Sequence, residues 1–134
     1  MQSLIGTWKL IEARAFDEAG NELPPPLGPN PMGMAIVEAE RMMAVVGDGR
    51  PTMPSGSPQR AFFAYTGNYQ FDVEQLVTRV DAASRPDGFE DQVRRIKFQG
   101  PNRMVIVPLS RVLDGQPGWR RVYADRWAVV HVAQ

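Results

Sequence analysis

The chain has 134 residues, which suits one domain with a core of its own. It contains no cysteine, so disulfides, a thiolate nucleophile and cysteine-ligated metals are excluded. Fifteen Lys and Arg residues balance fifteen Asp and Glu residues, and a net charge of zero argues against nucleic acid as a partner.

The start of the chain and its hydropathy bear on its location. The N-terminal residues contain neither a basic leader nor the apolar region of a signal peptide. The longest apolar runs, residues 34–37 and 42–46, are too short to cross a bilayer. We therefore expect a single cytoplasmic domain over residues 1–134, without a membrane partner.

Apolar residues at every second position predict strands along nearly the whole chain, because side chains of a strand alternate between its two faces. The predicted strands are residues 6–16, 34–38, 41–46, 65–72, 76–84, 92–99, 104–109 and 119–132. Proline and glycine in residues 24–31 and 48–58 predict two long connections. A short helical turn is predicted for residues 59–63.

The same alternation assigns side chains to faces. In the first strand Trp8 and Leu10 share a face with Glu12, so we expect an interior that accepts a polar group. In the fourth predicted strand the aromatic side chains share one face: Tyr65, Tyr69 and Phe71. In residues 92–99 Arg94 lies on the face of Ile96 and Phe98, which directs its guanidinium inward.

Eight to ten strands joined mostly by short turns favour an all-β fold, a closed antiparallel up-and-down barrel. Closure leaves no free sheet edge, and a barrel of this size has room for a packed core or one small ligand. A two-sheet sandwich is the alternative fold.

Several segments resemble a known family. Residues 6–10, Gly-Thr-Trp-Lys-Leu, are similar to the Gly-x-Trp opening of calycins, which include lipocalins and fatty-acid-binding proteins. With residues 25–33, 64–69 and 92–95, the chain resembles the bacterial lipocalin-like domain family over most of its length. The resemblance implies a lipocalin-like barrel but no common reaction.

The chain also departs from the pattern of its proposed relatives. The lipocalin Thr-Asp-Tyr motif is missing, and Arg79 stands where close relatives are expected to have histidine. The resemblance further implies a late-strand arginine packed on the opening Trp8, for which Arg120 or Arg121 is the candidate.

An inward Arg94 needs a partner, because burying an unpaired guanidinium is costly. Glu12 is the first candidate, and a Glu12–Arg94 pair inside a filled core is one alternative. The other is a binding site for a small, mostly apolar molecule with a polar or anionic end. Arg94 with Tyr65 or Tyr69 would hold that end, and the apolar body would contact Leu10, Ile36, Phe71 and Phe98.

Two further functions stay open. A small isomerase or cyclase using acid–base chemistry would draw its acid or base from Glu12, Asp81, Asp125, Arg94 or the tyrosines. A homodimer would use exposed strands and methionines near Met42 and Met43. His131 is the only histidine of the chain, so no second histidine is available to share a metal ion. We therefore expect neither a metal nor a cofactor.

Overall fold

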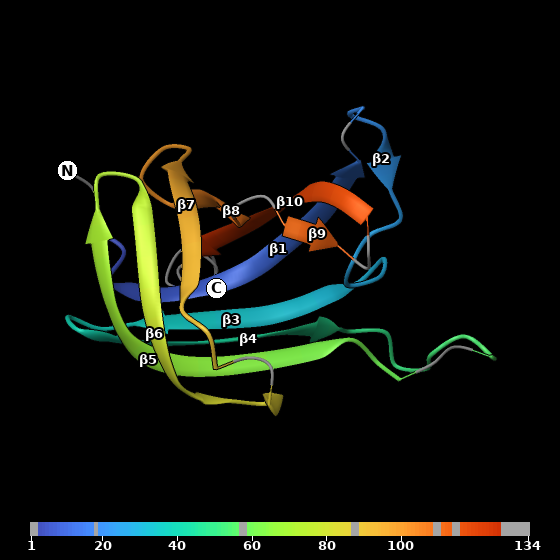
Figure 1. Cartoon of the computed structure of the whole chain (residues 1–134), viewed down its shortest axis with the longest axis horizontal. Coiled ribbons are helices and arrows are strands. Elements are labelled where there is room, and N and C mark those ends of the chain that lie inside the picture. Colours follow the sequence, from blue (N-terminus) through green and yellow to red (C-terminus); the bar gives the residue numbers. More distant parts are fainter. Residues whose placement is uncertain are drawn as a thin grey trace, which may run out of the picture.

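The computed structural model describes residues 3–17, 19–56, 59–86, 89–108, 111–113 and 116–126. Within these ranges the chain forms one antiparallel sheet of ten strands (Figure 1). The strands are β1 (Gly6–Asp17), β2 (Glu22–Leu23), β3 (Pro31–Val37), β4 (Arg41–Asp48), β5 (Phe62–Asp72), β6 (Gln75–Ala83), β7 (Gln92–Phe98), β8 (Arg103–Pro108), β9 (Arg111–Leu113) and β10 (Gln116–Arg126).

The sheet is an up-and-down meander that closes on itself. Its order is β2-β1-β3-β4-β5-β6-β7-β8-β10-β9, and an additional pairing of β1 with β10 completes the ring. The two shortest strands, β2 and β9, are additions at the margins. The ring confirms the predicted barrel and excludes the sandwich, because a sandwich consists of two separate packed sheets.

All eight predicted strands are present, with ends shifted by up to three residues where they are described. The predicted end at residue 132 lies outside the described residues. The predicted helical turn at residues 59–63 is wrong. There the Asp48 N–H donates to the Ala61 carbonyl at 2.9 Å, which continues the β4–β5 ladder into the loop. The described part of the chain contains no helix that is long and apolar enough to span a membrane.

The best-packed part of the core lies at the barrel end next to the β3–β4 turn. Trp8 is fully buried, and its Nε1–H donates to the Leu4 carbonyl at 2.9 Å. Val37 and Met42, the last pair of the β3–β4 ladder, belong to the same buried cluster. A buried indole whose N–H has a partner contributes large apolar area without an unsatisfied donor.

A β-bulge divides β1 into two halves with opposite alternation. Leu10 pairs with Ala124 and Glu12 pairs with the next residue of β10, so Ile11 is the extra residue. Leu10 is buried before the bulge, and Ala13 is buried after it. The inward positions therefore change from even to odd numbers at Ile11.

Candidate functional site

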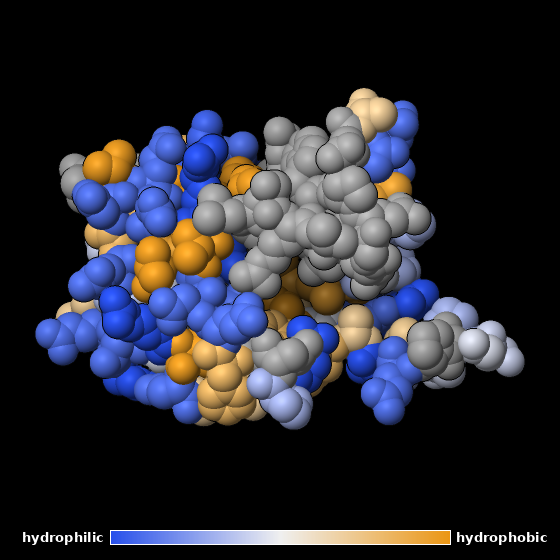
Figure 2. Space-filling model, viewed as in Figure 1, coloured by the Kyte–Doolittle hydropathy of each residue, from blue (hydrophilic) through white to orange (hydrophobic). Residues whose placement is uncertain are grey.

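Apolar and aromatic side chains line the inner face of the barrel. Among the described residues the buried cluster consists of Leu4, Trp8, Val37, Met42, Leu76, Ile96, Met104 and Ala124. Partly buried side chains pack against it: Ala35, Ala44, Tyr65, Tyr69, Phe71, Phe98 and Ile106. Figure 2 shows a recess in the face toward the viewer, and the visible floor of this recess is hydrophobic.

Three of the side chains predicted to contact the apolar body of a ligand lie on this inner face. Leu10 is buried and packs so closely on Gly33 that a Cβ there would stand 3.1 Å from its Cδ2. The rings of Phe71 and Phe98 meet edge to face, with centroids 6.4 Å apart. Phe98 lies equally close to Trp8, at 6.4 Å, so the aromatic lining continues into the buried cluster.

Arg94 takes the inward position that its pattern predicted. It is partly buried in β7, between Gln92 and Ile96, both of which are buried. Its guanidinium donates to Gln92 Oε1 and, at 3.1 Å, to the Val93 carbonyl. Gln92 in turn donates its Nε2–H to the Glu90 carbonyl at 3.3 Å, so the amide fixes the orientation of the guanidinium.

Tyr65 shares the environment of Arg94. Burial raises the pKa of the Tyr65 phenol, and the positive charge of Arg94 acts in the opposite direction. Its ring contacts Phe63, with centroids 5.4 Å apart. Within the described ranges, the Tyr65 hydroxyl has no hydrogen-bond partner from the protein. A buried hydroxyl of this kind is stabilised when water or a ligand supplies the missing bond.

Tyr69, the other predicted hydroxyl donor, has a structural role. Its hydroxyl donates to the Glu38 carbonyl at 2.5 Å, and its backbone N–H donates to the Glu40 carbonyl at 3.0 Å. Both bonds attach β5 to the β3–β4 turn. The hydroxyl hydrogen of Tyr69 is therefore already used, and of the two predicted hydroxyl donors only Tyr65 lacks a hydrogen-bond partner among the described residues.

Glu12 does not pair with Arg94, and this prediction is wrong. The bulge at Ile11 turns Glu12 to the outer surface, where its side chain is 54% exposed and lies 3.6 Å from Arg14 Nε. Arg14 also binds Glu22, at 2.6 Å. The Glu12–Arg94 pair is excluded both as a ligand site and as a core ion pair.

Ile36 also lies on the outer face, contrary to its predicted place in the lining. It pairs with Thr7 and Met43, while the next residue back, Ala35, pairs with the buried Trp8. Both faces of β3 carry apolar side chains, so alternation alone did not distinguish them. Met42 and Met43 likewise separate, since Met42 is buried and Met43 is 44% exposed.

The acidic groups considered for catalysis are not found together in the interior. Asp81 is half exposed and accepts hydrogen bonds from Arg41 at 2.8 Å and from Thr66 Oγ1 at 2.8 Å. These hydrogen bonds hold the pKa of Asp81 below its ordinary value, and the bond from Arg41 has the largest effect. The side chain of Asp125 and all of His131 lie outside the described residues. Across the described ranges, no three His, Cys, Asp or Glu side chains gather as a metal site would require.

A polar depression of about 270 Å³ lies at the β5–β6 turn. It is lined by Asp72, Val73, Glu74, Gln75, Arg94 and Arg95. Five of these six residues are exposed, whereas an apolar ligand needs a lining that excludes water. We therefore place the candidate site on the aromatic inner face, which Arg94 also borders.

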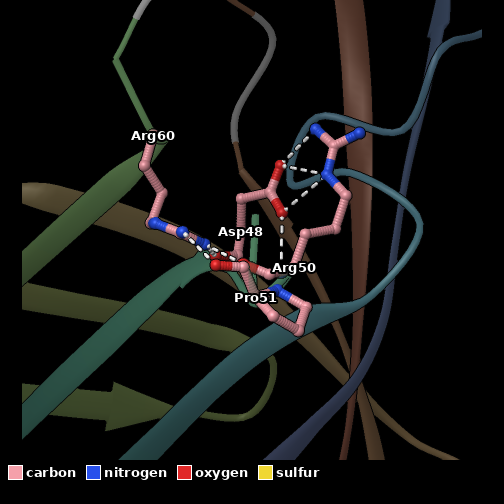
Figure 3. A network of polar contacts seen from close by, with 4 residues as sticks. All are labelled: Asp48, Arg50, Pro51 and Arg60. Atoms are coloured by element: carbon pink, nitrogen blue, oxygen red, sulfur yellow. Dashed lines mark hydrogen bonds and ion pairs between the residues drawn. The ribbon is translucent and has the colours of Figure 1, made fainter. Parts of the chain in front are cut away.

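The opposite end of the barrel from Trp8 is held by a charged network that the sequence analysis missed (Figure 3). Asp48 ends β4 and is only 2% exposed. Arg50 donates to the Asp48 carboxylate through Nε and through Nη2, the latter at 2.6 Å, and the Arg50 backbone N–H donates to Asp48 Oδ1 at 3.0 Å. These hydrogen bonds hold the pKa of Asp48 below its ordinary value, and the bonds from the Arg50 side chain have the largest effect.

Arg60 closes the same network from the other side of the loop. Its guanidinium donates to the carbonyls of Asp48, at 2.7 Å, and of Arg50 and Pro51 (Figure 3). The base of the long β4–β5 connection is therefore fixed by side chains. An acid at the end of an apolar strand, with arginines on both sides of a proline-rich loop, was the available sequence signal.

The calycin resemblance implies an arginine packed on Trp8. In the register of β1 with β10, the residue opposite Trp8 is not one of the two arginines predicted for this position. Arg120 and Arg121 pair with Ala15 and Arg14, at the far end of β1. The residue that pairs with Trp8 is Arg126. The predicted placement of Arg120 or Arg121 on Trp8 is thus wrong at the level of the backbone.

A closed up-and-down ring of antiparallel strands with an aromatic interior defines a small antiparallel β-barrel. A family model described as a lipocalin-like domain matches residues 5–122, and the chain belongs to that family. Five chains of known structure match as well. One is a redesigned β-barrel, with 11% sequence identity, a TM-score of 0.45, and 92% of this chain and 90% of that chain covered. No curated protein matches the chain.

Proposed function

We propose that the barrel binds a small, mostly apolar molecule whose polar or anionic end lies beside Arg94 and Tyr65. The observation that carries this proposal is an aromatic inner face that holds a partly buried phenol, that of Tyr65, without a hydrogen-bond partner among the described residues, together with the inward guanidinium of Arg94. Leu10, Phe71 and Phe98 would contact the apolar body. Membership in the lipocalin-like family supports the same kind of activity.

The geometry favours binding over acid–base catalysis. Glu12 and Asp81, two of the proposed proton donors, lie on the outer surface in contact with arginines. Arg94 stays protonated at physiological pH, and the pKa of Tyr65 is raised by burial, so neither group readily exchanges a proton near pH 7. Both groups can donate hydrogen bonds, which suits recognition of an oxygen-bearing end group.

The test compares two fluorescent probes of similar size, anionic 8-anilinonaphthalene-1-sulfonate and neutral N-phenyl-1-naphthylamine. Arg94→Met keeps an apolar stem of similar length but removes the charge. We expect it to weaken binding of the sulfonate about tenfold or more, because a charge-assisted hydrogen bond is lost, and to change binding of the neutral probe little. Tyr65→Phe should weaken binding of the sulfonate probe by a smaller factor than Arg94→Met.

Arg95→Met is the matched control, since Arg95 is the next residue of β7 and faces outward. Arg95 also borders the polar depression, so an equal loss in both variants would assign the sulfonate to that depression instead. Failure of both probes to bind the wild-type protein, or unchanged sulfonate affinity in a folded Arg94→Met variant, would contradict the proposal. Circular dichroism verifies that each variant is folded.

A further inference from the structure

The outer face of β3, β4 and the start of β5 is apolar across three neighbouring strands. The outward side chains are Met32, Met34, Ile36, Met43, Val45, Phe62 and Ala64, which we call the outer apolar face. The four largest of these that are exposed are Met32, Ile36, Met43 and Phe62, each 38–47% accessible. The outer face of an antiparallel sheet is ordinarily polar, so an apolar one needs an explanation.

The ladder pairings show that the outer apolar face is continuous. Ile36 pairs with Met43, and Met34 pairs with Val45. A third row runs over Gly47, where a Cβ would stand 3.2 Å from Met32 Cε and 3.5 Å from Phe62 Cδ2. Side chains from β3 and β5 thus approach each other over the glycine of β4, next to the Ala61 carbonyl.

The outward positions on the other side of the barrel are different in kind. There β6 and β7 present charged side chains: Arg79, Asp81, Arg95 and Lys97. Among the side chains that the structure describes, the outer faces of β6 and β7 therefore lack the uninterrupted apolar surface of β3 and β4.

We infer that the outer apolar face is the contact surface of a homodimer, with a second copy of this chain as its occupant. Two such faces can stack about 10 Å apart, as the sheets of a β-sandwich do. None of the seven side chains is charged, and the chain carries no net charge, so repulsion within the face and long-range repulsion do not oppose self-association. This inference is independent of ligand binding, since these side chains point away from the barrel interior.

The size of the face fits a modest symmetric interface. With three strands about 4.8 Å apart and a rise of about 3.3 Å per residue, the face spans roughly 14 by 17 Å. That is a flat projection of roughly 240 Å², and the accessible area of corrugated side chains is larger. A typical stable interface buries about 800 Å² per partner, so we expect a dimer that dissociates in the micromolar range.

The experiment is sedimentation equilibrium on the full chain from about 1 to 200 µM, with Met43→Lys and a matched Gln70→Lys variant. Gln70 is also an exposed, outward residue, but it lies near the other end of β5. In a symmetric dimer Met43→Lys places two ammonium groups in one apolar contact, and we expect the dissociation constant to rise at least about a hundredfold. Gln70→Lys should change it less than threefold.

A second measurement uses the absence of cysteine from the chain. Met43→Cys introduces a single thiol near the proposed two-fold axis, and mild oxidation should give a disulfide-linked dimer, while Gln70→Cys should stay monomeric on a denaturing gel. A wild-type protein that is monomeric at 200 µM would overturn the inference, as would a dimer that Met43→Lys leaves intact. Sedimentation of monomeric protein with phosphatidylglycerol vesicles would also overturn it, by assigning the face to a lipid surface.

Discussion

At the barrel end next to the β3–β4 turn, Trp8 is fully buried among Leu4, Val37 and Met42, whereas at the other end of β4 the buried side chain is Asp48. The first end is packed by apolar contacts with one indole hydrogen bond. The second end is joined by hydrogen bonds from arginines to a carboxylate and to backbone carbonyls (Figure 3).

This difference has consequences for how each end fails. Apolar packing is cooperative and non-directional, so its loss lowers the stability of the whole barrel. A network of directional bonds at a loop base mainly sets the free energy of local opening. We therefore expect substitutions near Trp8 to act globally and those near Asp48 to act on the residue 49–61 loop.

The largest expected effect is that of Trp8→Ala. It should lower the free energy of unfolding by roughly 3–5 kcal/mol, because it removes a fully buried ring and leaves a cavity. Urea unfolding followed by far-ultraviolet circular dichroism measures this loss. Trp8→Phe keeps much of the apolar volume and should be distinctly less destabilising. A loss below about 1 kcal/mol in Trp8→Ala would refute the assignment of Trp8 to the best-packed part of the core.

Asp48→Asn is expected to act locally. It removes the charge that Arg50 binds at 2.6 Å while preserving the shape of the side chain. Amide hydrogen exchange in residues 49–61 should accelerate about tenfold or more, with little change in the β7 and β8 amides. Exchange that accelerates equally in all strands would show that Asp48 belongs to the global core instead.

The pH dependence of the loop supplies the control. Asp48 has a folded-state pKa below its ordinary 3.8, so its contribution is fully present above about pH 5 and is lost as the pH falls through the folded pKa. Loop exchange, corrected for its intrinsic rate, should therefore rise in acid in the wild type. In Asp48→Asn this acid-dependent rise should be largely absent.

Gly28 and Gly20 provide a matched pair for the steric part of the network. Both have positive φ, +74° and +89°, so alanine costs roughly 1 kcal/mol of backbone strain at either position. At Gly28 the new Cβ would also stand 2.5 Å from Asp48 Oδ2, whereas at Gly20 it meets no atom within 4 Å. Gly28→Ala should therefore destabilise the protein more than Gly20→Ala in thermal unfolding, and equal effects would contradict this.

The same two regions show what a sequence can and cannot predict. Strand positions follow from alternation, and Arg94 was placed on the inner face because Ile96 and Phe98, which share its parity, are apolar and lie in the core. Glu12 was misplaced because a single extra residue, Ile11, reverses the alternation in β1. A bulge cannot be recognised from the alternation of side chains. Every residue of the strand that follows an unrecognised bulge is therefore assigned to the wrong face.

Other errors have different physical sources. Ile36 could not be assigned by alternation because β3 is apolar on both faces, and its place follows only from the strand register, in which the neighbouring Ala35 pairs with the buried Trp8. The Tyr69 hydroxyl is used by a carbonyl 31 residues away, at Glu38, and such a contact depends on tertiary structure. Asp48 was missed because a lone acid before a loop is usually solvated, and its burial depends on Arg50 and Arg60.

The smallest expected effect concerns the β5–β6 turn, which lies at the same end as Phe71 and Leu76. Val73 has φ +55° and is 68% exposed, so a β-branched residue occupies a strained conformation without burying its side chain. Val73→Gly removes roughly 1–2 kcal/mol of strain but adds flexibility to the unfolded chain, for a net stabilisation of about 0.5 kcal/mol. Val77→Gly, within the β6 ladder, should instead destabilise by about 1 kcal/mol. If urea unfolding shows that both substitutions destabilise equally, then turn strain at Val73 contributes nothing to the stability of this end.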